Sequence, residues 1–256
     1  CLQPKALSMS FSRLDDGKYM SAMLPHWELE HYRQLYRDQI DRLVDTLTVR
    51  LLPTFDSVHA EVEAIQREAY RANNERANDG NWLDPQTAHD AAFEASSVHF
   101  DIVLDLRQGL QNMFALTLYH LFEQQVRAFH VRVLHHKPLK FGPDVMKAWD
   151  KTLPDPVLTT EQLSGLDELR LVANAVKHGD GASAQELYTA APHLFLADYE
   201  QDALDDPTVI VHKPDIGTPL FGQDLFVRLD DIHRYRQLLN GIWSAYLEAL
   251  HGAGRS

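Results

Sequence analysis

The feature that most constrains this chain is a stretch from Pro85 to Leu134 whose pattern is helical almost without interruption. Only Gly109 weakens it, because glycine inside a helix costs about 1 kcal/mol relative to alanine. The later part, NMFALTLYHLFEQQVRAFHVRVL (residues 112–134), is apolar on most of its sides. A helix of that kind has to be surrounded by other elements. The sequence therefore predicts a mainly α protein with this helix at the centre of a bundle.

Residues 26–78 predict two further helices. Apolar side chains recur with a period of 3.6 residues over HWELEHYRQLYRDQIDRLVDTL, and Pro53 is expected to break the pattern. The turn NDGNWLDP (78–85) is then expected to lead into the long helix. A final amphipathic helix is predicted over residues 229–250.

A shorter helix carries clear end signals. Thr159 is the expected N-cap, and Gln162 stands three residues later, which is the spacing of a capping box. Gly179 is the expected terminator, since glycine readily adopts the left-handed conformation that ends many helices. Ser183 and Glu186 are expected to cap a short helix that follows.

One region predicts β structure. The apolar runs VIV (209–211) and LFV (225–227) flank the turn signal PDIGTP, which is typical of a small β-hairpin. We therefore expect a short β insertion near residues 207–228.

Charge and composition exclude several classes of function. The formal net charge is −13, and a strongly acidic protein is a poor non-specific binder of nucleic acid. Any contact with RNA is therefore expected to be local, and residues 101–153 are the one region with a positive balance. The single cysteine, Cys1, excludes an intrachain disulfide and a cysteine-based zinc site. No apolar run predicts a membrane span or a signal peptide, so a cytoplasmic location is expected.

Candidate site residues gather at the end of the helix that Gly179 terminates. Asn174 and His178 are four residues apart and share a face, Lys177 is adjacent to it, and Arg170 lies two turns earlier. In one reading, Lys177 and His178 only complement the helix dipole. In the other reading, the same side chains form an active site.

The long central helix carries further charged candidates. Glu123 and Arg127 are four residues apart in apolar surroundings, so each is expected to be paired, within the helix or with a neighbouring one. Arg132 lies further along the same helix. No HExxH motif, glycine-rich phosphate loop or GxSxG motif is present, so neither a metal nor a cofactor is expected.

The segment LRLVANAVKHGDGASAQELYTAAPHLF resembles bacterial proteins of the HEPN superfamily. The resemblance rests on a helix that ends in Asn-x-x-x-His before a glycine, followed by a short helix and a Pro-x-Leu-Phe segment. The preceding LYHLFEQQVRAF, with its embedded acid and arginine, fits the same family. The resemblance covers residues 101–250, so we expect a HEPN-like bundle over 101–256 and a helical extension over 1–100.

The resemblance implies an up-and-down bundle that forms a homodimer and acts as a metal-independent endoribonuclease. Members of this kind serve as toxins or antiphage defence effectors, which implies an RNA substrate and an antitoxin or defence-system partner. His178, Asn174, Lys177 and Arg170 would be catalytic, and three residues would contact the substrate: Arg127, Glu123 and Arg132. The chain departs from the family pattern, because seven residues separate Arg170 from His178 instead of four to six.

The sequence leaves two functions open. One is the ribonuclease, in which a histidine moves protons, an arginine or lysine offsets the developing charge, and an asparagine donates to a phosphoryl oxygen. The other is a non-catalytic HEPN-like binding or scaffold protein, which the displaced arginine and the charge of −13 favour.

Overall fold

The computed structural model describes residues 24–78, 84–134, 157–179, 182–197, 220 and 224–253. Helices dominate these residues, and no strand occurs among them, which confirms the mainly α class. The helices are α1 (His26–Asp45), α2 (Val58–Asn78), α3 (Pro85–Ala128), α5 (Thr160–His178), α6 (Ala182–Ala190) and α8 (Leu229–Ala253).

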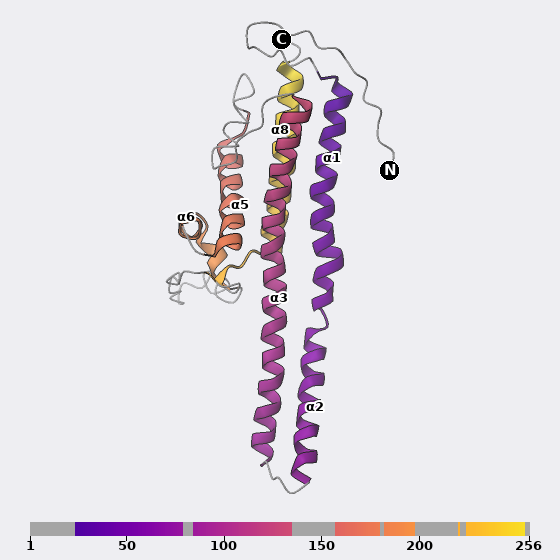
Figure 1. Cartoon of the computed structure of the whole chain (residues 1–256), viewed down its shortest axis with the longest axis vertical. Coiled ribbons are helices and arrows are strands. Elements are labelled where there is room, and N and C mark those ends of the chain that lie inside the picture. The colour runs from indigo at the N-terminus through magenta and orange to yellow at the C-terminus, as the bar shows by residue number, and fades with distance from the viewer. Residues whose placement is uncertain are drawn as a thin grey trace, which may run out of the picture.

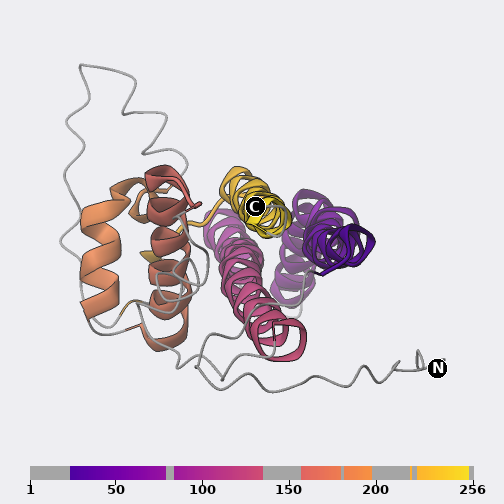
Figure 2. The same ribbon diagram turned by 90° about the horizontal axis from the view of Figure 1, so that it is seen from above.

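Helix α3 is the axis of the molecule (Figure 1). The half of α3 nearer its C-terminus packs against α1, α5 and α8, whereas α2 covers the half nearer its N-terminus. Viewed along the axis, α1 lies on one side of α3 and α8, and α5 lies on the other with α6 outside it (Figure 2). The molecule is therefore a helical bundle from which the α2–α3 hairpin projects.

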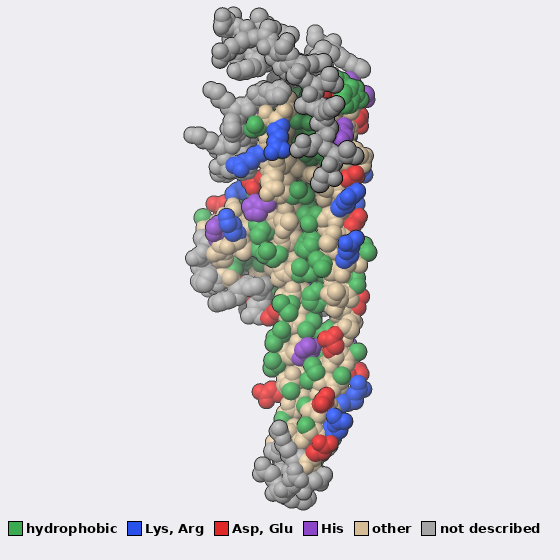
Figure 3. All heavy atoms as spheres, turned by 45° about the vertical axis from the view of Figure 1, so that its right-hand side comes forward, with side chains coloured by type: hydrophobic (Ala, Val, Ile, Leu, Met, Phe, Trp, Pro, Cys, Tyr) green, Lys and Arg blue, Asp and Glu red, His purple; other side chains and the backbone are tan. Residues whose placement is uncertain are grey.

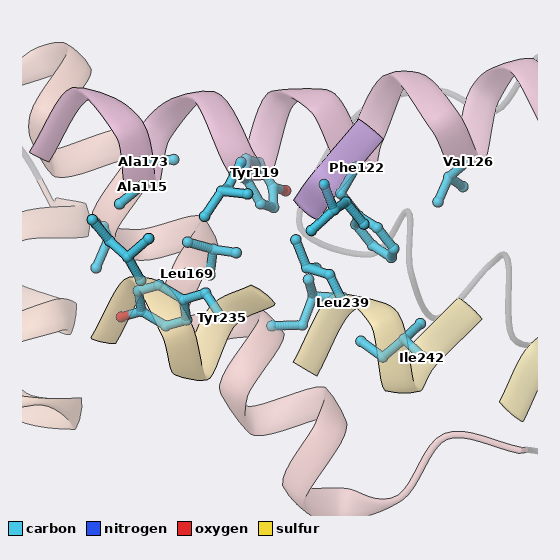
Figure 4. Close-up of a cluster of buried hydrophobic side chains, with 14 of the residues drawn as sticks. Ala115, Tyr119, Phe122, Val126, Leu169, Ala173, Tyr235, Leu239 and Ile242 are labelled. Atoms are coloured by element: carbon cyan, nitrogen blue, oxygen red, sulfur yellow. The ribbon is translucent and has the colours of Figure 1, made fainter. Parts of the chain in front are cut away.

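The bundle is held by a core of large aromatic and aliphatic side chains. Figure 4 shows α3 side chains such as Phe122 facing α8 side chains such as Leu239. Trp243 of α8 lies at the centre, with ring centroids 4.4 Å from Tyr36 of α1 and 5.5 Å from Phe129. Each of these aromatic side chains is at most 5% exposed. Burying one such side chain contributes about 1.5–3 kcal/mol.

One buried polar side chain fixes how these helices sit against each other. The Gln125 amide nitrogen donates to the Tyr36 carbonyl oxygen at 3.2 Å and to the Gln39 side-chain oxygen at 2.9 Å. The Gln125 oxygen in turn accepts from the Trp243 indole N–H at 2.9 Å. A buried amide left without partners would cost about 1–3 kcal/mol, so this set of bonds disfavours any other register of the three helices.

The first two predicted helices are confirmed, and the chain changes course between them. The α-helical bonding of α1 ends at Asp45, and a π-helical turn, Thr46–Leu51, follows it. Pro53 then lies in a 3₁₀ turn, Leu52–Phe55, because a proline lacks the N–H that an α-helix interior needs. The turn predicted at 78–85 falls largely on residues 79–83, outside the described residues.

The end signals of α5 are confirmed. Thr159 caps the helix, and the reciprocal bonds with Gln162 form the predicted capping box. Gly179 ends the helix at a positive φ of 62°. The prediction for the next helix needs a correction, because α6 begins at Ala182, so Ser183 lies inside its first turn and is not its cap.

The predicted strand LFV (225–227) is not a strand. Leu225 and Val227 are buried, but their backbone groups bond to α3 side chains and not to a neighbouring strand. Asn112 donates to the Leu225 carbonyl oxygen at 2.8 Å and accepts from the Val227 N–H at 3.2 Å. The other predicted strand, VIV (209–211), lies outside the described residues.

The boundary expected between residues 100 and 101 falls inside α3, which is continuous there. Helix α1, from the expected N-terminal extension, contributes Leu29, Ile40 and Val44 to the same hydrophobic cluster as α5 and α8. The residues before position 100 therefore contribute both a core helix, α1, and the outer helix, α2.

Replacing Gly179 with alanine should destabilise the fold. The positive φ is costly for any residue with a Cβ, and an added Cβ would lie 3.1 Å from the Leu220 carbonyl oxygen. We expect a loss of about 1–2 kcal/mol in the free energy of unfolding, measured by urea denaturation.

The matched control is Gly109→Ala, since an added Cβ there meets nothing within 4 Å. That change lies inside α3 and should be neutral or stabilise by up to about 1 kcal/mol. Equal effects of the two substitutions would contradict this account of the end of α5.

Candidate functional site

The last turn of α5 presents the three candidate residues that lie nearest Gly179. Asn174 is half-buried, whereas Lys177 and His178 are exposed. Within the described part of the chain, no hydrogen bond or ion pair involves these three side chains. Both basic residues lie at the negative end of the helix dipole. The turn is thus a polar surface whose side chains can contact a ligand.

The backbone around this turn is held in place. The Gly179 N–H bonds to the Ala175 carbonyl oxygen at 2.8 Å, and the Gly179 carbonyl oxygen accepts from the Leu220 N–H at 2.6 Å. Both groups of Gly179 are therefore satisfied although the helix has ended. The backbone next to His178 is consequently fixed, while the His178 side chain has no hydrogen bond or ion pair with another described residue.

Arg170 is separated from this turn and is already paired. Eight residues along a helix correspond to about 12 Å, so Arg170 and His178 are far apart along the axis of α5. The Arg170 guanidinium lies 2.8 Å from the Asp167 carboxylate and 3.9 Å from that of Glu186 on α6. Its side chain is 18% exposed. Two nearby carboxylates offset its charge, which weakens it as a phosphate ligand.

Glu123 belongs to a second polar group, on the α3 side of the α3–α5 interface. Its side chain is 16% exposed, and one carboxylate oxygen lies 3.1 Å from Nδ1 of His120. Burial, followed by the nearby Glu123 carboxylate, raises the pKa of Tyr119, while the Arg170 charge acts in the opposite direction. The charges of Glu123 and Arg170, two of the predicted site residues, therefore both act on Tyr119.

The remaining two candidates lie elsewhere. Arg127 and Arg132 are exposed near the C-terminal end of the long helix, Arg132 in the π-helical turn Phe129–Val133 that follows α3. Among the ion pairs between described residues, Glu123 pairs with His120, three residues earlier, and not with Arg127. The intrahelical Glu123–Arg127 pair, one of the two arrangements expected from the sequence, is thus not formed.

Sequence analysis missed a network that joins α5 to α8. One carboxylate oxygen of Glu168 accepts from Arg234 at 2.6 Å and from the buried Tyr235 hydroxyl at 2.7 Å. Arg234 also donates to Asp231 at 3.0 Å, and His193 lies 3.7 Å from the same carboxylate. The spacing of three residues between Asp231 and Arg234 could have predicted their ion pair. Glu168 and His193 are far from them in the sequence, so their part in the network could not be predicted locally.

Several further properties bear on this site. In the described ranges, no three or more His, Cys, Asp or Glu side chains are grouped so that they could hold a metal ion. The described helices include none with the length and apolarity that crossing a membrane requires. No family model matches the sequence, and neither curated proteins nor solved structures include a match to it. The candidate site therefore has to be judged on its own chemistry.

Asp231→Asn should destabilise the protein near neutral pH. Burial alone would raise the pKa of Asp231, but hydrogen bonds from His193, the Arg228 N–H and Arg234 outweigh it and lower the pKa. A hydrogen bond to a charged group contributes about 1.5–3 kcal/mol, and we expect a loss of that order in the free energy of unfolding.

The pH dependence follows from the direction of that shift. A lowered carboxyl pKa gives stability that is present above the ordinary value of about 4 and is lost as the pH falls further. The difference between wild type and Asp231→Asn should thus be present at about pH 5 and shrink as the pH falls below about 4. Asp230→Asn is the control, since Asp230 shares the first turn of α8 but is exposed. A pH-independent difference would contradict the role given to the Asp231 charge.

Proposed function

We propose that this protein is a metal-independent endoribonuclease of the HEPN type whose active site is the last turn of α5. The observation that supports the proposal is the position of Asn174, Lys177 and His178. All three lie on one helical end, next to a fixed glycine, and none has a partner within the described residues. A phosphodiester could therefore approach them without displacing an interaction made by another described residue.

Each of these side chains has a role in RNA cleavage. The reaction requires a base for the 2′-hydroxyl, stabilisation of the phosphorane and an acid for the 5′-oxygen. His178 can transfer protons, since the ordinary pKa of a histidine is close to neutral. Lys177 can offset the charge that develops on the phosphoryl oxygens, and Asn174 can donate a hydrogen bond to one of them. Lys177 would supply the positive charge that the family pattern assigns to an arginine.

A homodimer would bring two copies of this turn into one groove and concentrate positive charge that one chain lacks. The apolar surface of residues 110–134 cannot supply the whole contact. Its largest side chains, such as Phe122 and Phe129, are fully buried within the chain itself. The dimer contact would therefore have to use other surfaces. As a toxin or defence effector, the enzyme would be restrained by an antitoxin or another partner of its defence system.

A second function, a non-catalytic binding or scaffold protein of the same fold class, is favoured by one specific observation. The Arg170 guanidinium is already held by Asp167 and Glu186, and Arg170 lies about two turns from His178. An enzyme that relied on Arg170 would first have to break these ion pairs. The net charge of −13 also favours a protein partner over RNA.

His178→Ala should abolish cleavage and leave the fold intact. Removing an acid–base group costs about 10²–10⁴-fold in rate, whereas losing a favourable charge at a helix end costs only about 0.3–1 kcal/mol. Purified protein is incubated with structured and unstructured RNA in EDTA, and a thermal melt is recorded on each variant. Asn174→Ala and Lys177→Ala should also lower the rate at unchanged melting temperature.

The matched control is His89→Ala, because His89 is an exposed histidine on the projecting part of α3. Its cleavage rate should equal that of the wild type. Cleavage that persists in His178→Ala, or that needs an added metal, would exclude the proposed mechanism. No cleavage by the wild-type protein would favour the non-catalytic function.

A further inference from the structure

The α2–α3 hairpin buries small side chains and exposes large ones. Where α3 faces α2, its buried residues are Ala88, Ala92 and Ser96. Large apolar side chains of the same helix remain in contact with water, and five of them are 52–60% exposed. Phe93 lies on a different face of α3 from the other four, which are Val98, Ile102, Leu106 and Met113. Folding of the chain alone therefore leaves much of the apolar area of this hairpin uncovered.

The other four side chains form one continuous stripe. Their spacings of four, four and seven residues place them on the same face of α3 over about 22 Å. Gly109 lies on this face too, and an added Cβ at Gly109 would meet nothing within 4 Å. Figure 3 shows hydrophobic side chains running along the lower part of the molecule, which α2 and α3 form. A stripe of this shape matches the apolar seam of one further helix.

A row of carboxylates flanks the stripe. Glu94, Asp101 and Asp105 are spaced seven and four residues apart, about 80° around α3 from the stripe. All three are exposed and have no ion pair or hydrogen bond within the described residues. Acidic side chains beside an apolar seam favour a partner helix that carries Lys or Arg in the flanking positions.

A second copy of the hairpin is a poor partner for the stripe and its row of carboxylates. Residues 58–78 and 85–108 contain eight carboxylates and four arginines, which gives the hairpin a net charge of −4. In an antiparallel pair of identical helices, the same edges meet, so Asp105 of one copy would lie close to Asp105 of the other. Like charges at such positions are destabilising.

Two other segments of the same chain also fit poorly. Residues 198–219 contain six acidic residues and one lysine, a net charge of −5. Residues 135–156 are tethered at residue 134, about 48 Å along the helix axis from Ile102. The segment must also return to residue 157, so it can extend from residue 134 by only about half of its extended length. For 22 residues this half is about 40 Å, which is shorter than the distance to Ile102.

We propose that the stripe of Val98, Ile102, Leu106 and Met113 is the docking surface for an amphipathic helix of another protein, with Lys or Arg beside its apolar seam. The hairpin then becomes part of an intermolecular helical bundle, and the row of Glu94, Asp101 and Asp105 selects a basic partner. This inference is independent of ribonuclease activity, because none of these residues belongs to the last turn of α5.

The test uses the full chain and two designed helical peptides of four heptads. Both peptides carry leucine at positions a and d, and positions e and g carry lysine in one and glutamate in the other. We expect the lysine peptide to bind more tightly than the glutamate peptide, and we expect added salt to weaken its binding. Fluorescence anisotropy of the labelled peptides measures both affinities.

Substitutions locate the surface. Ile102→Ser with Leu106→Ser should weaken binding of the lysine peptide about tenfold or more, and Asp101→Asn with Asp105→Asn should weaken it several-fold. Leu104→Ser is the control, since Leu104 is exposed on a different face of α3. Thermal melts verify that the exposed positions can be changed without unfolding.

Four outcomes would overturn the proposal. The first is that neither peptide binds, and the second is equal binding of the two peptides. The third is a dimer in light scattering that Ile102→Ser with Leu106→Ser dissociates, because a second copy would then occupy the stripe. Loss of binding in the Leu104→Ser control would also place the contact elsewhere.

Discussion

The length of α3 is the constraint on which the rest of the structure depends. This helix has 44 residues, about 66 Å, whereas α8 has 25 and α1 has 20. Neither α8 nor α1 is long enough to cover α3 from end to end, so the two halves of α3 need separate partners. The C-terminal half is enclosed by α1, α5 and α8, and the N-terminal half has α2. The contrast between a closed bundle and an open hairpin follows directly from this difference in length.

Buried side-chain amides explain how the closed half acquires one register. Gln125 links α3 to both α1 and α8, and Asn112 and Gln108 bind the backbone of residues 225–227. Such groups bring little net stability when paired but are costly when left unpaired. Aromatic packing around Trp243 therefore supplies the driving force, and the amides discriminate against alternative arrangements. The segment before α8 is held by the side chains of a helix, which is why its apolar pattern does not form a strand.

Much of the fold could be predicted from the sequence because its helices carry local signals. Thr159 with Gln162 and Gly179 define both ends of α5 through interactions within three or four residues. The strand prediction failed for the opposite reason, since residues 225–227 are bonded by residues more than 110 positions earlier. Alternation of apolar residues reports burial, and it does not report which groups satisfy the backbone.

In the candidate site, too, the features set by local sequence were predictable, and those set by contacts between helices were not. The last turn of α5 was predictable, because Asn174, Lys177 and His178 follow one another on a capped helix. Pairing of Arg170 with Asp167 was also visible as a spacing of three residues. The second carboxylate near Arg170, that of Glu186, belongs to α6, and the Arg170 charge also acts on Tyr119 of α3. These contacts depend on how three helices meet, which no local pattern encodes.

The end of α5 and the exposed stripe of the hairpin differ in what they require of a ligand. At the end of α5, polar side chains on a fixed backbone offer charge and hydrogen bonds but little apolar area, which suits a small polar group such as a phosphodiester. Along the hairpin, apolar area is abundant and the flanking charge is negative, which suits a basic helix and disfavours nucleic acid. In the proposed ribonuclease, a carboxylate-lined hairpin would repel the phosphate backbone of RNA and remain available to a protein partner. The net charge of −13 is therefore compatible with both proposals.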